Sequence, residues 1–279
     1  MKGLIHNADQ SFYINGLQMS GISSLDATYS IPAEENNFLG YIGPADLIQN
    51  APGVGNFSFQ RVMMSSDEPI TELLLMEDGF DGGVEFNSQE INFQSGYINS
   101  YECSFSVDSL PQSTVSISAY GEIGPSVVKQ KSPINQKELF TPTSSGISVD
   151  FDGRETNRVL SFSFSMNLDH KPVYKIGSIF PCEVVLGTPI RQNFSIEIEV
   201  DDYQTRSVYD YIKTGIHFED IKVILRDQCS RDRQIEYNFN DAHLLSEQFS
   251  TDADNNTKVK LNYSTVSRYR PSIIYRWNT

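Results

Sequence analysis

Apolar and polar residues alternate along much of this chain, a pattern typical of β-strands that bury one face. In residues 193–200, phenylalanine, isoleucine and valine occupy every second position, whereas Ser195, Glu197 and Glu199 fall between them. Residues 145–151 alternate in the same way. Successive side chains of a strand point to opposite faces, so these segments predict strands with one apolar and one polar face.

The second half of the sequence also repeats part of the first half. Residues 39–59 (LGYIGPADLIQNAPGVGNFSF) align with residues 176–196 (IGSIFPCEVVLGTPIRQNFSI) without a gap. The clustered identities indicate the duplication of one structural unit. We expect the identical proline, asparagine and phenylalanine residues to determine the fold and not a chemical function. These pairs are Pro44 with Pro181, Asn56 with Asn193, and Phe57 with Phe194.

The segments around this repeat correspond in kind. Mixed polar and apolar runs, at residues 22–29 and 159–166, precede the shared segment at the same distance. After it, acidic residues begin a short helical pattern at residues 67–75 and again at residues 201–212, as helix N-termini prefer. Each half is therefore predicted to carry one short helix beside its strands.

A predicted β-hairpin closes each half. The first hairpin covers residues 91–121 and the second covers residues 237–267. Clusters of turn-forming residues at 108–111 and 252–256 separate the two strands of each hairpin. The same order of elements thus occurs twice along the chain.

These patterns predict a mainly β fold with two tandem β-sandwich or barrel units, each with one short flanking helix. Residues 1–123 form the first predicted unit and residues 145–279 the second. Residues 124–144, rich in proline, lysine and serine, are predicted to be an exposed linker. The basic and aromatic segment 268–279 is either an arm that docks on a neighbouring subunit or a last edge strand, and we favour the arm.

The charge of the chain limits its partners. The formal net charge is −15, and a tightly bound nucleic acid needs clustered lysine and arginine residues, which argues against such a partner. An acidic surface remains compatible with DNA that slides past without sticking. It also serves simply to keep a subunit soluble.

The cysteines and the N-terminal sequence indicate a cytoplasmic site of synthesis. Cys103, Cys182 and Cys229 are widely spaced and odd in number, so we interpret them as thiols of a protein made in a reducing compartment. The first residues contain no apolar signal-peptide region, and no apolar run approaches the length of a membrane span.

Three short motifs have some likeness to chemical sites, and none is specific. His217 lies in a His-Phe-Glu-Asp run that has no second cluster with metal-ligand spacing. Residues 53–55 (Gly-Val-Gly) lead into a predicted strand, unlike a phosphate-binding loop. Residues 77–83, acidic and rich in glycine, lack the ligand pattern of an EF-hand and are predicted to be a flexible turn. We therefore assign no catalytic, cofactor-binding or metal-binding residue, and we expect that the protein is not an enzyme.

The predicted sheets have two consequences for assembly. A face that carries repeated carboxylates, such as that of residues 193–200, either is an ordinary solvated outer face or lines an acidic channel. Unpaired strand edges are a liability unless they are covered, and a closed ring of subunits removes them. Three chains of two units would give a ring of six similar blocks.

Two stretches of the sequence that carry these features resemble the tail tube (major tail) proteins of tailed bacteriophages. They are residues 21–61 (GISSLDATYSIPAEENNFLGYIGPADLIQNAPGVGNFSFQR) and residues 146–205 (GISVDFDGRETNRVLSFSFSMNLDHKPVYKIGSIFPCEVVLGTPIRQNFSIEIEVDDYQT). The resemblance implies a β-sandwich with one flanking helix, in rings stacked around a DNA conduit. It also implies a virion protein of the phage tail, assembled in the bacterial cytoplasm with itself and other tail proteins, without a membrane and without cofactors.

Because the usual ring of that family is a hexamer of single units, two units per chain suggest a homotrimer with pseudo-sixfold symmetry. This difference from the single-unit family is also compatible with another tail component, such as a distal tail, baseplate hub or tube-capping protein. A carbohydrate- or receptor-binding β-sandwich module is the alternative from another functional class.

Overall fold

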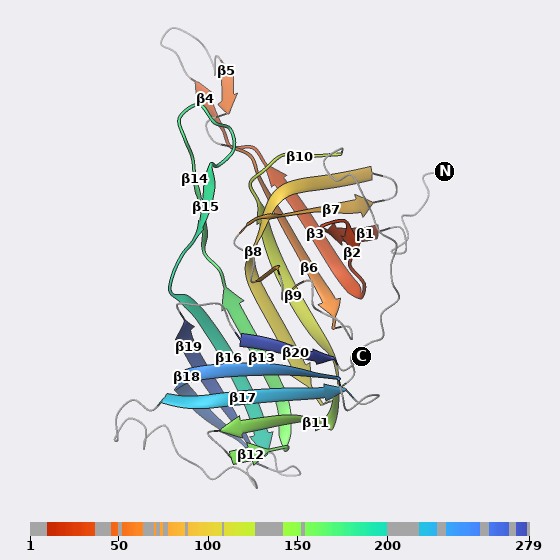
Figure 1. The fold of residues 1–279 in the computed structure, drawn as a ribbon, viewed down its shortest axis with the longest axis vertical. Helices are drawn as coiled ribbons and strands as arrows, with labels where there is room; N and C mark the ends of the chain where they lie inside the picture. The colour runs from red at the N-terminus through yellow and green to blue at the C-terminus, as the bar shows by residue number, and fades with distance from the viewer. Residues whose placement is uncertain are drawn as a thin grey trace.

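A computed structural model describes the fold (Figure 1). The described residues are 10–36, 46–49, 52–63, 70, 73–74, 78–86, 89–107, 109–125, 142–151, 154–199, 218–227, 233–251, 257–267 and 272–277. Within them the chain is mainly β, as predicted, and every pairing between strands is antiparallel. The molecule is elongated, with one group of strands above the other (Figure 1).

The upper group, which we call unit 1, covers residues 10–124. One layer contains β3, β6, β9 and the C-terminal half of β8, and the facing layer contains β2, β1, β7, β10 and the N-terminal half of β8. A separate hairpin, β4–β5, projects from it (Figure 1). The strands are β1 (Gln10–Ile14), β2 (Leu17–Gln18), β3 (Ile22–Ser30), β4 (Ala33–Asn36), β5 (Asp46–Gln49), β6 (Val54–Val62), β7 (Phe80–Phe86), β8 (Gln89–Ser106), β9 (Ser109–Ala119) and β10 (Ile123–Gly124).

The lower group, unit 2, covers residues 142–277 and has the same plan. Its layers are β13, β16, β19 and the C-terminal half of β18, against β12, β11, β17, β20 and the N-terminal half of β18. The hairpin β14–β15 projects from it. The strands are β11 (Pro142–Phe151), β12 (Arg154–Thr156), β13 (Val159–Asn167), β14 (His170–Val173), β15 (Glu183–Leu186), β16 (Ile190–Glu199), β17 (Phe218–Asp227), β18 (Arg233–Ser250), β19 (Lys258–Ser267) and β20 (Ser272–Trp277).

The repeat seen in the sequence extends to the register of strand pairing. In unit 1, Thr28 lies opposite Asn56, and in unit 2 the aligned Ser165 lies opposite the aligned Asn193. Both β3–β6 and β13–β16 have a register shift at the same place, after their first paired residues. Hairpins β4–β5 and β14–β15 also pair with matching registers. Such agreement, bulge included, indicates that one fold unit has been duplicated.

The long strands β8 and β18 bend so that each takes part in both layers of its unit. Ser95 in β8 and Asp241 in β18 both have a φ of 52°, in the left-handed region that few non-glycine residues adopt. Register shifts against the neighbouring strands lie close to both residues. Ser95 and Asp241 occupy equivalent positions in the two repeats, so the duplicated units share this bend as well.

Aromatic side chains fill the space between the layers at equivalent positions. In unit 1 the ring of Phe57 packs on that of Phe93, with centroids 4.4 Å apart. In unit 2 the equivalent rings of Phe194 and Phe239 stack at 3.9 Å. All four side chains are buried. The alternation predicted for residues 193–199 is confirmed, because Ile196 and its apolar neighbours in β16 are buried while the polar residues between them are not.

The glycine-rich segment 79–83 corrects one prediction. The sequence predicts a flexible turn there, but Phe80–Gly83 belong to strand β7. A Cβ atom on Gly82 would overlap the ring of Phe93, and one on Gly83 would overlap the side-chain amide of Asn92. The glycines therefore make room for close packing of β7 against β8, which is a common reason for glycine inside a strand.

Both predicted hairpins are confirmed by pairing of β8 with β9 and of β18 with β19. The predicted helices stay predictions. Ile70, Leu73 and Leu74 are helical and buried, whereas the rest of segment 67–75 and the whole of segment 201–212 lie outside the described residues.

Three boundaries differ from those predicted. Ser272–Trp277 form β20, which pairs with β18 of the same chain, so these residues are an edge strand and not a docking arm. Gly124 belongs to β10 and Pro142 to β11, which shortens the predicted linker at both ends. At both ends of the linker, backbone pairing continues into a segment whose proline and lysine residues indicated an exposed connector.

Candidate functional site: the joint between the units and the polar sheet face

The two units are joined edge to edge by strands β8 and β13. Ser161 of β13 lies opposite Ser106 of β8, and the pairing runs without a break to Asn167 opposite Ser100. Consequently the layer β3–β6–β9–β8 of unit 1 continues into β13–β16–β19–β18 of unit 2 as one sheet. We call this pairing of β8 with β13 the joint.

Buried aromatic residues pack on the core side of the joint. The ring of Phe105 in β8 lies against the rings of Phe162 in β13 and Tyr237 in β18, with centroids 5.9 and 6.2 Å apart. Cys103 Sγ is 3.4 Å from the hydroxyl of Tyr237. Because these side chains are buried between the units, the units behave as parts of one core and not as beads on a linker.

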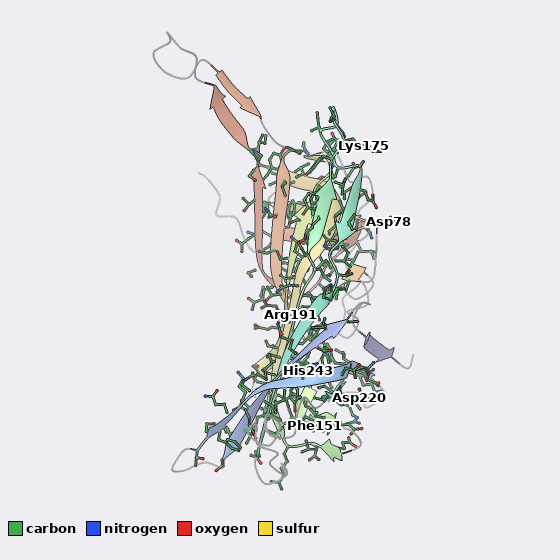
Figure 2. All side chains as sticks on the ribbon, turned by 90° about the vertical axis from the view of Figure 1, so that its left-hand side faces the viewer. Asp78, Phe151, Lys175, Arg191, Asp220 and His243 are labelled. Carbon is green, nitrogen blue, oxygen red and sulfur yellow. The ribbon has the colours of Figure 1, made fainter. Side chains whose placement is uncertain are left out.

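The base of hairpin β14–β15 extends the joint over unit 1. The backbone N–H of Leu168 donates to the carbonyl of Asn99 at 2.7 Å, and the hydroxyl of Tyr120 donates to the carbonyl of His170 at 3.3 Å. Lys175, beyond the end of β14, lies alongside unit 1, away from the labelled Phe151 and Asp220 of unit 2 (Figure 2). The hairpin of one unit therefore rests on the other unit.

The alkaline stability of this contact gives a first prediction. Burial raises the pKa of Tyr97 above its ordinary value, and the ring of Tyr97 lies 5.1 Å from that of His170. A phenol with a raised pKa stabilises the fold fully below its ordinary pKa of about 10, and that stability is lost as pH rises through the raised value. We expect Tyr97→Phe to lose less stability than the unsubstituted protein above pH ~10, as measured by urea unfolding. An equal loss in both proteins would contradict this.

The face opposite the core in the continuous layer is polar from edge to edge. Cross-strand partners share a face, so their side chains form rows across the sheet. Ser163 and Ser195 are hydrogen-bonded at 2.7 Å, and Gln60 Nε2 donates to Gln112 Oε1 at 2.8 Å. Two such rows are Gln60, Thr114, Glu102, Ser165, Asn193 and Ser264, and Gln112, Ser104, Ser163, Ser195, Asn262 and Ser246.

This polar face is rich in hydroxyl and amide groups and also carries charged residues of both signs, among them Glu102 and Arg191. Glu197 and Glu199, which suggested an acidic face, lie opposite Lys260 and Lys258 of β19. A shallow hollow crosses the face near the joint. Its polar lining consists of Gln60, Glu102, Ser104, Gln112, Thr114, Ser163 and Ser165.

The tip of hairpin β14–β15 is an exposed apolar surface. Ile176 and Ile179 at this tip, with Phe180 beside them, are exposed. Contiguous exposed apolar residues of this kind mark contact surfaces between proteins. Pro181 also lies at this tip and is half-buried, whereas its counterpart Pro44 lies outside the described residues.

The remaining expected fold-determining residues divide between core and surface. Phe57 and Phe194 are buried, in agreement with their expected role. Asn56 accepts a hydrogen bond from Ser118 Oγ at 2.9 Å across β6 and β9. Asn193 is exposed on the polar face.

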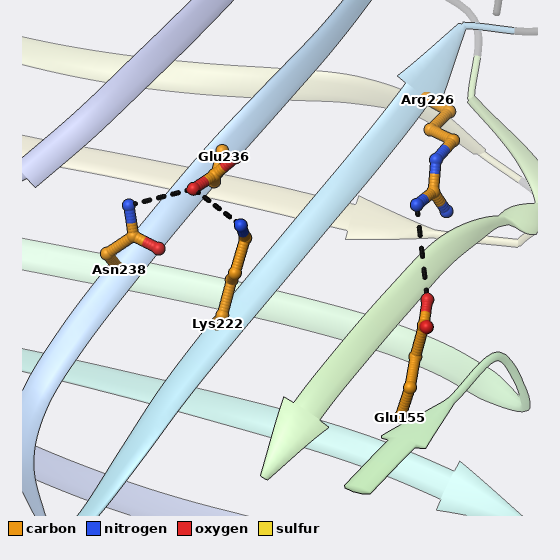
Figure 3. A network of polar contacts seen from close by, with 5 residues as sticks. All are labelled: Glu155, Lys222, Arg226, Glu236 and Asn238. Carbon is orange, nitrogen blue, oxygen red and sulfur yellow. Dashed lines mark hydrogen bonds and ion pairs between the residues drawn. The ribbon is translucent and has the colours of Figure 1, made fainter. Parts of the chain in front are cut away.

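A repeated polar motif went unnoticed in the sequence, Glu-x-Asn-Phe at residues 90–93 and again at 236–239. In unit 2, Asn238 Nδ2 donates to Glu236 Oε1 at 3.1 Å, and Lys222 Nζ lies 2.8 Å from the same oxygen (Figure 3). In unit 1, Asn92 donates to Glu90 at 3.2 Å in the same way. Extension of the alignment that places the closing hairpins on each other would have revealed this motif.

The described part of the chain offers no cluster of three or more histidine, cysteine or acidic residues that could hold a metal ion. Cys103 is buried and Cys182 is exposed, while Cys229 and His217 lie outside the described residues. No helix within the described ranges is long and apolar enough to cross a membrane.

A comparison of the sequence with known protein families and with curated proteins found no match to either.

Proposed function

We propose that this protein is a structural subunit of a bacteriophage tail, which assembles into rings that form a tail tube for the passage of DNA. Three chains would form one ring with pseudo-sixfold symmetry. The observation that carries the proposal is the joint, where two units of identical register unite into one continuous sheet. A unit that adds to its own copy edge to edge is the element from which a ring is built.

The composition of the polar face supports the proposal that this face lines a conduit. Its rows contain mainly serine, threonine, asparagine and glutamine, and Lys258 and Lys260 are opposed by glutamates. Such a surface offers few cationic groups to phosphates, and the net charge of −15 weakens DNA binding further. DNA would thus be a non-specific cargo in the lumen and would not be a ligand.

The hairpins support stacking of one ring on the next. Hairpin β14–β15 projects beyond its own unit and has an apolar tip around Ile176 and Ile179. In a tube this tip would contact an adjacent ring or another tail protein. The assembled virion, built in the bacterial cytoplasm, would be the place where the protein acts.

Electron microscopy of the purified protein tests this proposal. We expect class averages of end-on views to show rings or tubes with threefold or pseudo-sixfold symmetry around an open channel. Discrete particles without a channel at every protein concentration would contradict the proposal. Growth of tubes only upon addition of other tail proteins would favour a distal tail, hub or tube-capping component.

The hollow on the polar face favours one second candidate, a carbohydrate- or receptor-binding module. Its lining of carboxylate, amide and hydroxyl groups near Glu102 and Gln112 is suited to sugar hydroxyls. Saturable binding of a glycan that Glu102→Ala abolishes, by a particle without a channel, would establish this alternative over the tube.

A further inference from the structure

Two strand edges of the chain correspond to the two edges that form the joint. β3 of unit 1 is the counterpart of β13, and β18 of unit 2 is the counterpart of β8. In the part of the chain that the structure describes, β3 pairs only with β6, and residues 244–250 of β18 pair only with β19. The chain therefore contains one complete joint, between β8 and β13. It also contains the two strand edges, on β3 and β18, that a second joint of the same kind would need.

At several positions that are buried in the joint, the free edges carry exposed apolar side chains. Tyr29 is 50% exposed and Ile31 is 52% exposed, whereas their counterparts Met166 and Leu168 are 1% and 4% exposed. On β18, Phe249 is 49% exposed, and its counterpart Cys103 in β8 is buried. Leu245, also on this edge, is exposed as well. Exposed apolar residues at just these positions indicate a surface that another strand covers.

We propose that β3 of one chain pairs antiparallel with the C-terminal half of β18 of a second copy, in the register of the joint. By that register, Ala27 lies opposite Phe249 of the partner subunit. The backbone N–H of Ile31 donates to the carbonyl of the partner's Leu245, as the N–H of Leu168 donates to that of Asn99 within the chain. This inference rests on the proposed function only for the closure of the ring, since the pairing itself follows from the repeat.

At one core-facing position, the side-chain volumes of the two edges agree with this occupant. In the joint, the large Phe164 lies opposite the small Cys103. Between chains the order is reversed, with the small Ala27 opposite the large Phe249, so the combined volume is retained. Because β3 and β18 are different surfaces, the contact is heterologous, and successive chains add head to tail until the rotation closes a ring.

Cysteine pairs across the proposed contact test both the partner and the register. In a background with Cys182→Ser and Cys229→Ser, chains with Thr28→Cys are mixed with chains with Gln248→Cys. These exposed residues are the counterparts of Ser165 and Glu102, which lie opposite each other in the joint. We expect a covalent dimer on a non-reducing gel after mild oxidation, and little of it from either variant alone.

A matched control fixes the register. Ser24→Cys mixed with Ser246→Cys places the thiols far out of register, roughly 20 Å apart, so no cross-link is expected. Equal cross-linking of both mixtures, or cross-linking of neither, would overturn the proposal. Rings seen by microscopy without the Thr28–Gln248 cross-link would refute this contact but leave the tube proposal standing. Formation of the cross-link in open chains without a channel would support this contact and refute the tube proposal.

Surface substitutions give a second readout that does not depend on thiols. Ile31→Ser and Phe249→Ser remove exposed apolar groups of the two edges, so the isolated chain should fold while self-association weakens at least tenfold. Leu17→Ser, at a residue 50% exposed in β2, is the control and should associate normally. Unchanged association of Phe249→Ser would contradict the contact.

Discussion

Replacement of Phe194 by alanine is expected to lower the free energy of unfolding by about 3–5 kcal/mol, and replacement of Phe57 should cost about the same. Both rings are buried between the layers, and each packs against an equivalent partner, Phe239 or Phe93. Truncation of either ring loses its burial and leaves a cavity that the two sheets cannot close. Urea unfolding of the two variants measures the losses.

A comparison of these two losses of stability tests whether the cores of the two units are equivalent. If the units are duplicated in packing as well as in register, the two substitutions should differ by less than about 1 kcal/mol. Phe249→Ala is the control, because Phe249 is half-exposed and its truncation should cost little in the unassembled chain. A large loss at Phe194 with almost none at Phe57 would contradict equivalent cores.

Lys222→Met is expected to lower the free energy of unfolding by about 2–3 kcal/mol, because it removes the ammonium group that pairs with the buried carboxylate of Glu236. That carboxylate is 4% exposed, and the ammonium of Lys222 is 2.8 Å away (Figure 3). Glu155→Gln is the matched control, since Glu155 is 62% exposed and lies 3.9 Å from Arg226, and it should cost at most about 1 kcal/mol.

A second substitution identifies the cause of the loss at Lys222. Glu236→Gln in the Lys222→Met background removes the buried charge, so it should restore part of the lost stability. Urea unfolding of the single and double variants completes the cycle. If Lys222→Met costs no more than Glu155→Gln, the ion pair does not stabilise the buried carboxylate as described.

The strands and their duplication could be predicted because both follow from local patterns. Alternation places Phe194 and Glu197 on opposite faces whatever the rest of the chain does, and an ungapped repeat reports a shared structure directly. Turn-forming residues likewise located the hairpins formed by β8 with β9 and by β18 with β19.

Features that depend on distant packing could not be predicted in this way. Gly82 and Gly83 indicate a flexible turn until the side chains of Phe93 and Asn92 fill the space beside them. The bends at Ser95 and Asp241 have no common sequence signal, since a serine and an aspartate take the same backbone conformation. The propensities of single residues carry no information about such tertiary contacts.

The joint could not be predicted from the sequence for a related reason. Its two strands, β8 and β13, lie in different halves of the chain, and a linker between two halves suggests separate domains. Only the pairing shows that the first unit continues into the second. The same pairing then identifies β3 and β18 as its unfilled counterparts, and it thus connects the fold to the proposed assembly.

The mass of the assembled particle in solution tests the central claim most directly. Native mass spectrometry of the purified chain is expected to give a closed species of three chains, three times the 31.5 kDa of one chain, with no ladder of larger open forms. Phe249→Ser should shift this species toward single chains. Only single chains at every concentration, with Phe249→Ser indistinguishable from the unsubstituted protein, would contradict the account.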